Sequence, residues 1–276
     1  CQRTLAPSSV AMADLTKHGI NEVFHWGRGV DSERFSPDKR STELREEWDP
    51  TGQKCIVGYV GRLAAEKGVR RLAVLDQDER YQVVIVGDGP QRSELQELMP
   101  NAVFAGALDG DDLAHAYASL DVFVHTGEYE TFCQAIQEAL ASGVPAIGPH
   151  AGGPIDLITS GVDGYLLDVE TFEQELVETV EMITEPSRHS AMRVAAREGV
   201  RHKTWHALCG QLMTHYNDVI DRSHRIPLTS GRCRNCPCGR PKPSARGALK
   251  PHSTSSAPRQ ARSVLYAQSC GKSIPG

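Results

Sequence analysis

The sequence predicts an α/β protein in which one parallel sheet with flanking helices forms a single Rossmann-like domain, followed by a disordered tail. Two observations favour this fold class. Between residues 51 and 200, short apolar runs alternate with helical patterns, and this alternation is typical of βα units wound into one sheet. The composition, with 39% hydrophobic and 24% charged residues, is that of an ordinary globular protein.

Six apolar runs form the predicted sheet. Each is rich in Val, Ile or aromatic residues and is bounded by Gly, Pro or Asp, which favour turns. In chain order the predicted strands cover residues 55–59, 82–86, 102–104, 121–125, 144–147 and 165–167. None of these runs approaches the length needed to cross a bilayer.

Helical patterns lie between these strands. The predicted helices cover residues 68–75, 91–98, 111–119, 132–142, 154–159 and 171–184, followed by 187–200 and 204–220. Pro90 is tolerated in a first helical turn, Asp111 and Asp112 place negative charge at a helix start, and Gly143 follows a helix end. The last helix has one apolar stripe, which indicates that one of its sides is buried.

Residues 1–50 do not follow this alternation. They predict a helix from Ser8 or Ser9 to about His18 and a short strand at 23–26. We interpret this part as the remnant of a preceding domain and an interdomain linker.

Residues 227–276 differ again, because they contain nine Lys or Arg and no acidic residue, and Ser, Pro and Gly dominate. This composition predicts disorder. A nucleic-acid-binding arm is disfavoured because aromatic residues are scarce among the charges. Cys233, Cys236 and Cys238 resemble half of a zinc site, but no second ligand pair accompanies them, so we expect no metal there.

Two glycine-rich turns, at residues 58–61 and 87–90, each follow a strand and precede a helix, as a phosphate-binding turn does. Neither is a dinucleotide fingerprint, because Arg92 stands where the third glycine would be required, and no P-loop triplet exists. Glycines also serve plain turns, so both roles stay open here.

Two cations, Arg62 and Lys67, lie on the loop that leaves the first predicted strand of the sheet. In open α/β sheets, ligands bind at the carboxyl ends of the strands. Fixed cations there would stabilise the negative charge that develops on a leaving pyrophosphate. Solvated surface charges are the alternative interpretation.

Two carboxylates, Glu130 and Glu138, are separated by seven residues across a strand-to-helix junction. They can reach opposite ends of one extended ligand. The backbone N–H groups of Phe132, Cys133 and Gln134 lie between them at a helix N-terminus, where a phosphate is favoured.

Residues 29–216 resemble the C-terminal half of the family-4 retaining glycosyltransferases, which have the two-domain GT-B fold. Three motifs in order carry the resemblance: the Gly-Arg…Glu-Lys-Gly loop at 61–68, the Glu-x7-Glu element from Glu130 to Glu138, and the Ala-Gly-Gly-Pro turn at 151–154. The amino-acid sequence of the second motif is most similar to that of actinobacterial GDP-mannose-dependent α-mannosyltransferases of glycolipid synthesis.

The resemblance implies a role for each site residue. Arg62 and Lys67 would hold the diphosphate, Glu130 would bind hydroxyls of the donor hexose, and Glu138 would bind the two ribose hydroxyls, since a carboxylate can accept from both. The nucleoside pocket would be walled by three glycines: Gly87, Gly89 and Gly106.

The resemblance also implies transfer with retention of configuration by front-face attack. Glu130, Arg62 and Lys67 would be the catalytic residues, with Glu130 positioning the donor and not acting as a nucleophile. No metal cofactor is expected, because the cations and the helix N-terminus already supply positive potential. His125 could line the sugar site, but a histidine at a strand end is more often structural, and we do not count it as a site residue.

The expected organisation has four parts: an N-terminal-domain remnant with linker (1–50), the donor-binding domain (51–200), a closing helix (201–226) and the basic tail (227–276). Expected partners are a nucleotide sugar, a lipid-linked acceptor at the membrane surface and a missing N-terminal domain that holds this acceptor, with no nucleic acid. We expect a cytoplasmic location, peripheral at the inner face of the plasma membrane, and an apolar face of the closing helix left partly bare.

Several alternatives stay open. The chain could be a non-catalytic nucleotide-sugar-binding fragment, which binds donor but transfers poorly or not at all. It could also be a UDP-sugar-dependent glycosyltransferase of the same family. An epimerase or phosphorylase on the same architecture is disfavoured, because the acidic pair at this spacing belongs to the transferases.

Overall fold

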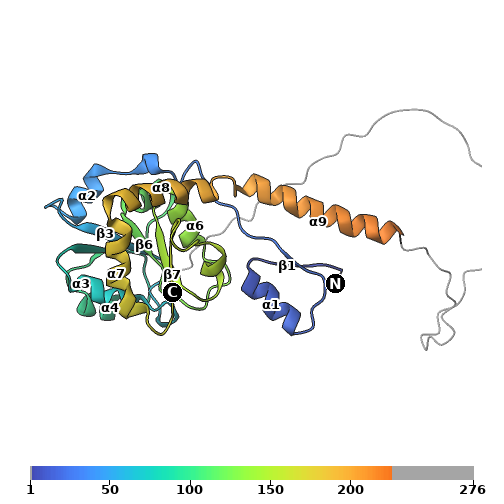
Figure 1. Ribbon diagram of the computed structural model, residues 1–276, viewed down its shortest axis with the longest axis horizontal. Coiled ribbons are helices and arrows are strands. Elements are labelled where there is room, and N and C mark those ends of the chain that lie inside the picture. The colour runs from blue at the N-terminus through green and yellow to red at the C-terminus, as the bar shows by residue number, and fades with distance from the viewer. Residues whose placement is uncertain (1, 226–276) are drawn as a thin grey trace, which may run out of the picture. The chain divides into compact units, whose positions relative to one another are not determined.

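A six-stranded parallel sheet is the main feature of the computed structural model, which describes residues 2–225 (Figure 1). Its strands are β3 (Cys55–Val60), β4 (Tyr81–Val86), β5 (Val103–Gly106), β6 (Val122–Val124), β7 (Ala146–Pro149) and β8 (Gly164–Leu167). They lie in the order β5-β4-β3-β6-β7-β8, and all neighbouring pairs are parallel. The predicted fold class is confirmed; the tail at 227–276 lies outside the described residues.

The strand order reverses at β3. From β3 the chain moves outward through β4 to β5, and it then returns to β6 on the other side of β3. Because the connections run in opposite directions from this point, the loops after β3 and β6 diverge and leave a crevice at the carboxyl end of the sheet.

Helices pack on both faces of the sheet. One face is covered by η3 (Val69–Leu72), α3 (Ala73–Asp76), α4 (Arg92–Leu98) and α7 (Phe172–Thr184). The other face is covered by α2 (Thr42–Trp48), α5 (Gly110–Ser119), α6 (Gln134–Ala141) and the end of α8 (Pro186–Val200), as Figure 1 shows. All six residues of β4 are buried, as expected for a strand with helices on both sides.

Strand β3 shows how the sequence fits this layered arrangement. Ile56 packs in the core on one face, while Val57 and Tyr59 pack in the core on the other face. Gly58 leaves room for Leu120, because a Cβ atom at position 58 would lie 2.2 Å from Leu120 Cδ1. Gly58 lies inside the strand and serves close packing, so the turn predicted at 58–61 begins only after Val60.

Most predicted elements are present, and the differences are local. The predicted helix at 68–75 begins as the 3-10 turn η3, and the predicted helix at 154–159 is the 3-10 turn η4 (Gly153–Asp156). Pro154 lies in the first turn of η4, where proline is tolerated, so it fits the start of this element and does not explain its short length. The elements that the sequence analysis missed are β1 (Thr4–Ala6), η1 (Pro37–Lys39), η2 (Ala65–Lys67) and α2.

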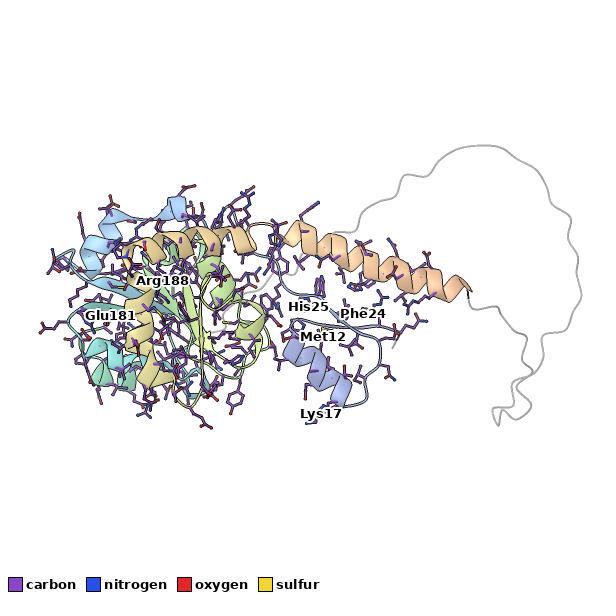
Figure 2. The ribbon with its side chains drawn as sticks, in the orientation of Figure 1. Met12, Lys17, Phe24, His25, Glu181 and Arg188 are labelled. Atoms are coloured by element: carbon purple, nitrogen blue, oxygen red, sulfur yellow. The ribbon has the colours of Figure 1, made fainter. Side chains whose placement is uncertain are left out.

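The first residues of the chain form a small two-stranded sheet with one helix. Strands β1 and β2 (Val23–His25) pair in parallel, and α1 (Ser9–Lys17) connects them. Phe24 and His25 lie on β2, between α1 and α9 (Trp205–Arg225), as Figure 2 shows. The Ser9 hydroxyl donates to Asp156 Oδ1 at 2.6 Å, which ties α1 to η4.

Helix α9 contacts residues that flank this small sheet. Trp26 Nε1 donates to the Leu208 carbonyl at 2.9 Å, and the Arg3 guanidinium donates to Asp218 at 3.1 Å. Large apolar side chains on α9 are nevertheless about half exposed: Trp205, Met213, Tyr216 and Ile220. This matches the expected partly bare face. Within residues 2–225, the helices are too short or too polar to span a membrane.

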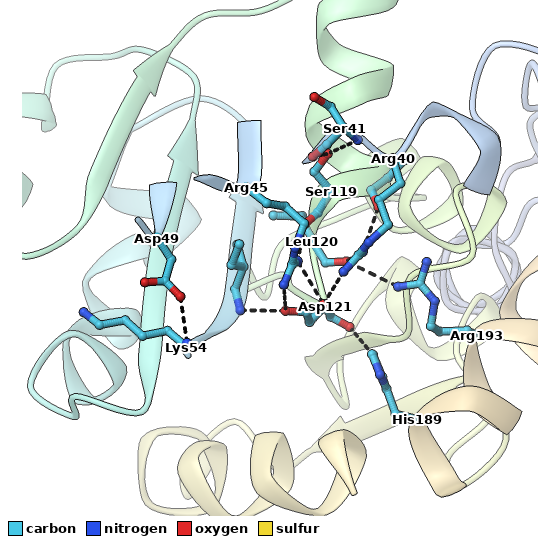
Figure 3. Close-up of polar contacts among 12 residues, drawn as sticks. Arg40, Ser41, Arg45, Asp49, Lys54, Ser119, Leu120, Asp121, His189 and Arg193 are labelled. Atoms are coloured by element: carbon cyan, nitrogen blue, oxygen red, sulfur yellow. Dashed lines mark hydrogen bonds and ion pairs between the residues drawn. The ribbon is translucent and has the colours of Figure 1, made fainter. Parts of the chain in front are cut away.

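A buried carboxylate holds the segment before β3 against the sheet (Figure 3). Asp121 precedes β6 and accepts hydrogen bonds from Arg40 Nη2 at 2.8 Å, Arg45 Nη1 at 3.0 Å and the Ile56 N–H at 2.9 Å. Burial by itself would raise the pKa of Asp121, but the Ile56 N–H and the two guanidinium groups outweigh it and hold the pKa below its ordinary value.

We expect Asp121→Asn to lower the free energy of unfolding by about 2 kcal/mol at pH 7, because it removes the charge shared by these donors. Since the folded-state pKa is depressed, this stabilisation is present above the ordinary aspartate pKa of about 4 and is lost as the pH falls through the folded value. Urea unfolding at pH 7 and pH 3 measures it. Asp111→Asn is the control, because that exposed carboxylate lies 3.7 Å from Lys39 Nζ. A deficit that is the same at both pH values would contradict the role of the charge.

Candidate functional site

The candidate site lies where the strand order reverses, at the carboxyl ends of β3 and β6. Two adjoining cavities of about 530 and 330 Å³ open there, and both are lined by Glu130, Cys133 and Gln134. Arg62, Lys67 and His125 line the smaller cavity, and Glu138 lines the larger one. The fold therefore brings together the two cations and the two carboxylates singled out in the sequence.

An ion pair joins the two loops across the crevice. Lys67 Nζ lies 2.5 Å from Glu130 Oε1, and both side chains are largely buried. The two loops are linked a second time, because the Thr126 side-chain hydroxyl donates to the Lys67 carbonyl at 2.6 Å. Gly68 adopts φ +62° beside this contact, a left-handed conformation that favours glycine. Lys67 and Glu130 thus neutralise each other.

Arg62 is held more loosely than Lys67. Its guanidinium pairs with Glu66, and the two side chains are 63% and 47% exposed. An exposed pair of this kind contributes about 0–1 kcal/mol, so the Arg62 side chain can leave Glu66 at little cost.

Arg71, which the sequence analysis did not single out, supports the loop after β6. Its Nη1 donates to the Thr126 carbonyl at 3.1 Å, and its Nη2 lies 2.6 Å from Glu128 Oε1. No local motif marks this arginine, because its partners lie more than fifty residues away in the chain.

The turn at 151–154 supports the same loop from the other side. The Gly153 N–H donates to the Glu130 carbonyl at 2.7 Å. A Cβ atom at Gly152 would lie 2.5 Å from the Glu130 carbonyl oxygen, and one at Gly153 would lie 2.4 Å from the Phe132 carbonyl oxygen. Two glycines are therefore needed for the turn to approach the Glu130 backbone so closely.

Cys133 is the residue where the loop becomes helix α6. It adopts φ +74°, a left-handed conformation that is unusual for a residue with a side chain, and it is buried. Burial raises the pKa of its thiol to about 12, so the thiol stays protonated and packs as a small apolar group. Among the described residues, the N–H groups of Phe132 and Cys133 donate no hydrogen bond.

The first turn of α6 also fixes the segment that follows β2. Gln134 Nε2 donates to the Gly29 carbonyl at 3.1 Å, and Gln137 Nε2 donates to the Arg28 carbonyl at 3.0 Å. Gly29 is required there, because a Cβ atom would lie 2.5 Å from the Trp205 nitrogen. The Gln134 side chain thus has a structural partner as well as a place in both cavities.

Glu138 lies one turn further along α6. Burial raises the pKa of its carboxyl to about 7, and the hydrogen bond from Tyr117 Oη to Glu138 Oε2, at 3.1 Å, offsets only part of this shift. Tyr117 is fully buried, and burial also raises its pKa well above 10. A carboxylate that is costly to bury in its charged form, and that lines a cavity, is a candidate for ligand binding.

His125 lies at the end of β6, and its ring is only 3% exposed. Burial lowers its pKa to about 4, an effect that Glu130 and the Gly127 backbone offset only in part, so the ring is neutral near pH 7. Neither ring nitrogen makes a hydrogen bond of normal geometry to a described residue. The structural role expected for His125 stays a prediction.

The three glycines assigned to a nucleoside pocket lie at the same edge of the sheet. The Gly87 N–H donates to the Gly106 carbonyl at 2.7 Å, and a Cβ atom at Gly87 would lie 1.9 Å from the Gly61 carbonyl oxygen. At Gly89 a Cβ atom would lie 2.3 Å from the Leu63 carbonyl oxygen. The close approach of these loops requires glycine, while contact with a nucleoside stays a prediction, since these glycines line neither of the two cavities.

The described side chains can be compared with the expectation that no metal is bound. Within residues 2–225 there is no group of three His, Cys, Asp or Glu side chains placed to hold a metal ion. The cysteines at 233–238 lie outside the described residues, and the expectation that no metal is used stays a prediction.

Comparisons with known proteins agree with this geometry. A family model described as glycosyl transferases group 1 matches residues 40–199. The GDP-mannose-dependent alpha-mannosyltransferase of Corynebacterium glutamicum is 64% identical over 229 residues, which are 83% of this chain and 55% of that protein. The protein of the same name from Mycolicibacterium smegmatis is 53% identical over 221 residues, 80% of this chain and 58% of that protein. The chain thus spans little more than half the length of these relatives.

Among solved structures, HepE from Anabaena in complex with UDP and glucose has a TM-score of 0.69 at 21% identity. The similarity covers 79% of this chain and 63% of that one, and it shows a shared fold.

We expect Glu138→Gln to raise the free energy of unfolding by about 2 kcal/mol at pH 8, because it removes a charge that burial disfavours. Folding raises the pKa from 4.5 to about 7, so the wild-type protein loses stability as the pH rises between these values. The gain should therefore vanish near pH 4, where both states are protonated. Denaturant unfolding between pH 4 and pH 8 measures it, with Glu198→Gln as the control because Glu198 is 54% exposed on α8. A loss of stability at pH 8 would contradict the assigned cost of burial.

Proposed function

Because this chain belongs to the glycosyl transferases of group 1, we propose that it binds a nucleotide sugar in the crevice between β3 and β6 and serves a mannosyltransferase that uses GDP-mannose. The observation that carries this proposal is the Lys67–Glu130 pair, which places a cation for a diphosphate and an acceptor for sugar hydroxyls on facing loops. The identity of 64% to a GDP-mannose-dependent enzyme favours guanine and mannose over other donors.

Lys67 and Arg62 are the proposed diphosphate ligands. When the bond between the sugar and the phosphate breaks, negative charge develops on the leaving nucleotide, and cations already in place stabilise it. Arg62 can turn from Glu66 toward a phosphate because their exposed pair is weak. The unused N–H groups of Phe132 and Cys133 add positive potential on the α6 side of the same cavities.

The two carboxylates have separate proposed tasks. Glu130, which lines both cavities, accepts hydrogen bonds from hydroxyls of the hexose, and Glu138, which lines the larger cavity, accepts them from the ribose. A ribose diol would hydrogen-bond the charged carboxylate of Glu138 and lower the pKa that burial has raised. No divalent metal is part of this proposal, because the phosphate charge is met by Arg62, Lys67 and backbone N–H groups.

We also propose that the sugar is transferred with retention of configuration to a lipid-linked acceptor at the inner membrane surface. The support for retention and for this acceptor is the motif resemblance described for residues 29–216. The same resemblance is the support for Glu130 as a positioning group that does not act as a nucleophile.

Nucleotide binding by the chain tests the assigned contacts. By calorimetry we expect GDP to bind more tightly than UDP or ADP, and Lys67→Met to weaken GDP binding by about tenfold to a hundredfold through loss of a charged contact. Glu138→Ala should weaken it by about tenfold. Lys54→Met is the matched control, because Lys54 precedes the same strand β3 that Lys67 follows. Unchanged GDP affinity in the Lys67 or Glu138 variant would contradict that residue's assignment.

Transfer is tested with labelled GDP-mannose and a lipid extract. The expected product carries an α-linked mannose, and Glu130→Gln should slow transfer by about a hundredfold, because the hexose is no longer positioned. NMR of the product gives the anomeric configuration. A β-linked product would rule out retention, and full activity of the Glu130 variant would rule out the role of this carboxylate.

A further inference from the structure

The donor site contains a buried polar group that the proposed function does not use, the imidazole of His125. It lies at the end of β6 and lines the smaller cavity together with Arg62, Lys67 and Glu130. Its Nε2 atom is 3.5 Å from Glu130 Oε1, the same oxygen that Lys67 Nζ approaches to 2.5 Å. Lys67 and His125 thus face one carboxylate oxygen, and only Lys67 is within hydrogen-bond distance of it.

The buried ring of His125 is poorly hydrogen-bonded. Its ring is 3% exposed, and neither nitrogen makes a hydrogen bond of normal geometry to a described residue. Buried polar groups in native proteins are nearly always hydrogen-bonded, so an unpartnered imidazole that lines a cavity indicates a partner that arrives later. The neutral ring has one N–H group and can donate without carrying a charge to the site.

The loop around His125 allows the ring to lie in this position. A Cβ atom at Gly127 would lie 3.2 Å from His125 Nε2, so a larger residue at position 127 would crowd the ring. The backbone of His125 is fixed as well, because its N–H donates to the Ile147 carbonyl at 2.8 Å on the neighbouring strand. The backbone that carries the imidazole is therefore fixed, and the ring stays close to the Glu130 carboxylate.

Donor binding would change the partner of Lys67. A diphosphate carries more negative charge than one carboxylate, so it competes with Glu130 for the ammonium group. Glu130 must then remain oriented toward the hexose with less help from Lys67. The group placed to provide this help is His125, which faces the same oxygen.

We propose that His125 is a positioning residue of the hexose site: when the donor diphosphate draws Lys67 away, His125 Nε2–H donates to Glu130 Oε1 and keeps this carboxylate facing the sugar hydroxyls. This inference rests on the nucleotide-sugar binding proposed above. It assigns to a neutral group the task of holding the carboxylate, which leaves the cations free for the phosphates.

The test compares the affinities of the chain for GDP and for GDP-mannose, because only the second ligand has a hexose. We expect His125→Phe to weaken GDP-mannose binding by about fivefold to tenfold, the loss of one hydrogen bond, while GDP affinity changes by less than about twofold. His125→Gln keeps an N–H donor and should recover much of the affinity for GDP-mannose. His189→Asn is the matched control, since His189 bonds the Asp121 carbonyl at the opposite end of β6.

The outcomes separate the two proposals. If Glu130→Gln removes the advantage of GDP-mannose over GDP and His125→Phe does not, the role of His125 is wrong and the proposed function stands. If His125→Phe weakens both ligands equally, the residue is only structural and the inference is also wrong. If the wild-type chain binds neither ligand, the proposed function and the inference fall together.

A second measurement uses the wild-type chain alone, in case His125→Phe does not fold. Nitrogen NMR of labelled histidines identifies the buried ring as one that stays neutral between pH 8 and pH 5, as burial requires for His125. We expect GDP-mannose to shift its Nε2–H resonance as the new hydrogen bond forms. An Nε2–H resonance that is unchanged by saturating GDP-mannose would overturn the inference.

Discussion

The reversal of strand order between β3 and β6 is the constraint on which the rest of the site depends. Neighbouring parallel strands normally have their carboxyl ends covered by similar crossovers, but here the two connections leave in opposite directions. The loops after β3 and β6 are therefore free to carry side chains that face each other. Lys67 on one loop and Glu130 on the other meet across this gap. Without the reversal, their charges would lie on separate parts of the surface.

The surrounding residues hold these loops at close range. Arg71 and Thr126 fasten the loop after β6 to the one after β3, and the glycines at 152 and 153 let a third loop reach the Glu130 backbone. The site also contains features that do not favour stability. Cys133 has a left-handed backbone, and Glu138 is a carboxyl whose charge is disfavoured by burial. Such features concentrate at binding sites, where function rather than stability selects the residue.

Much of the fold could be predicted from sequence, because the strands and longer helices carry strong local patterns. The alternation of apolar runs with helical repeats predicted the parallel sheet, and the six strands lie close to their expected positions. The short helix α2 was missed, since its seven residues bury little more than Trp48 and its packing depends on distant partners. Strand β1 was missed for the same reason, as its partner β2 is separated from it by α1.

The site was predictable where residues form local motifs and not where contacts come from far along the chain. The paired acids and the two cations were found by their spacing. The pairing of Lys67 with Glu130, the support from Arg71 and the unpartnered ring of His125 arise only when separate loops come together. His125 was set aside because a strand-end histidine is usually satisfied, and only the three-dimensional arrangement shows that its ring lines the cavity beside Glu130.

A crystal structure of the chain with GDP-mannose bound is the decisive measurement. We expect the diphosphate within hydrogen-bond distance of Lys67 Nζ, a hexose hydroxyl on Glu130, and the ribose hydroxyls on Glu138. A nucleotide sugar bound away from the crevice between β3 and β6, with the Lys67–Glu130 pair unchanged from its 2.5 Å contact, would contradict this expectation.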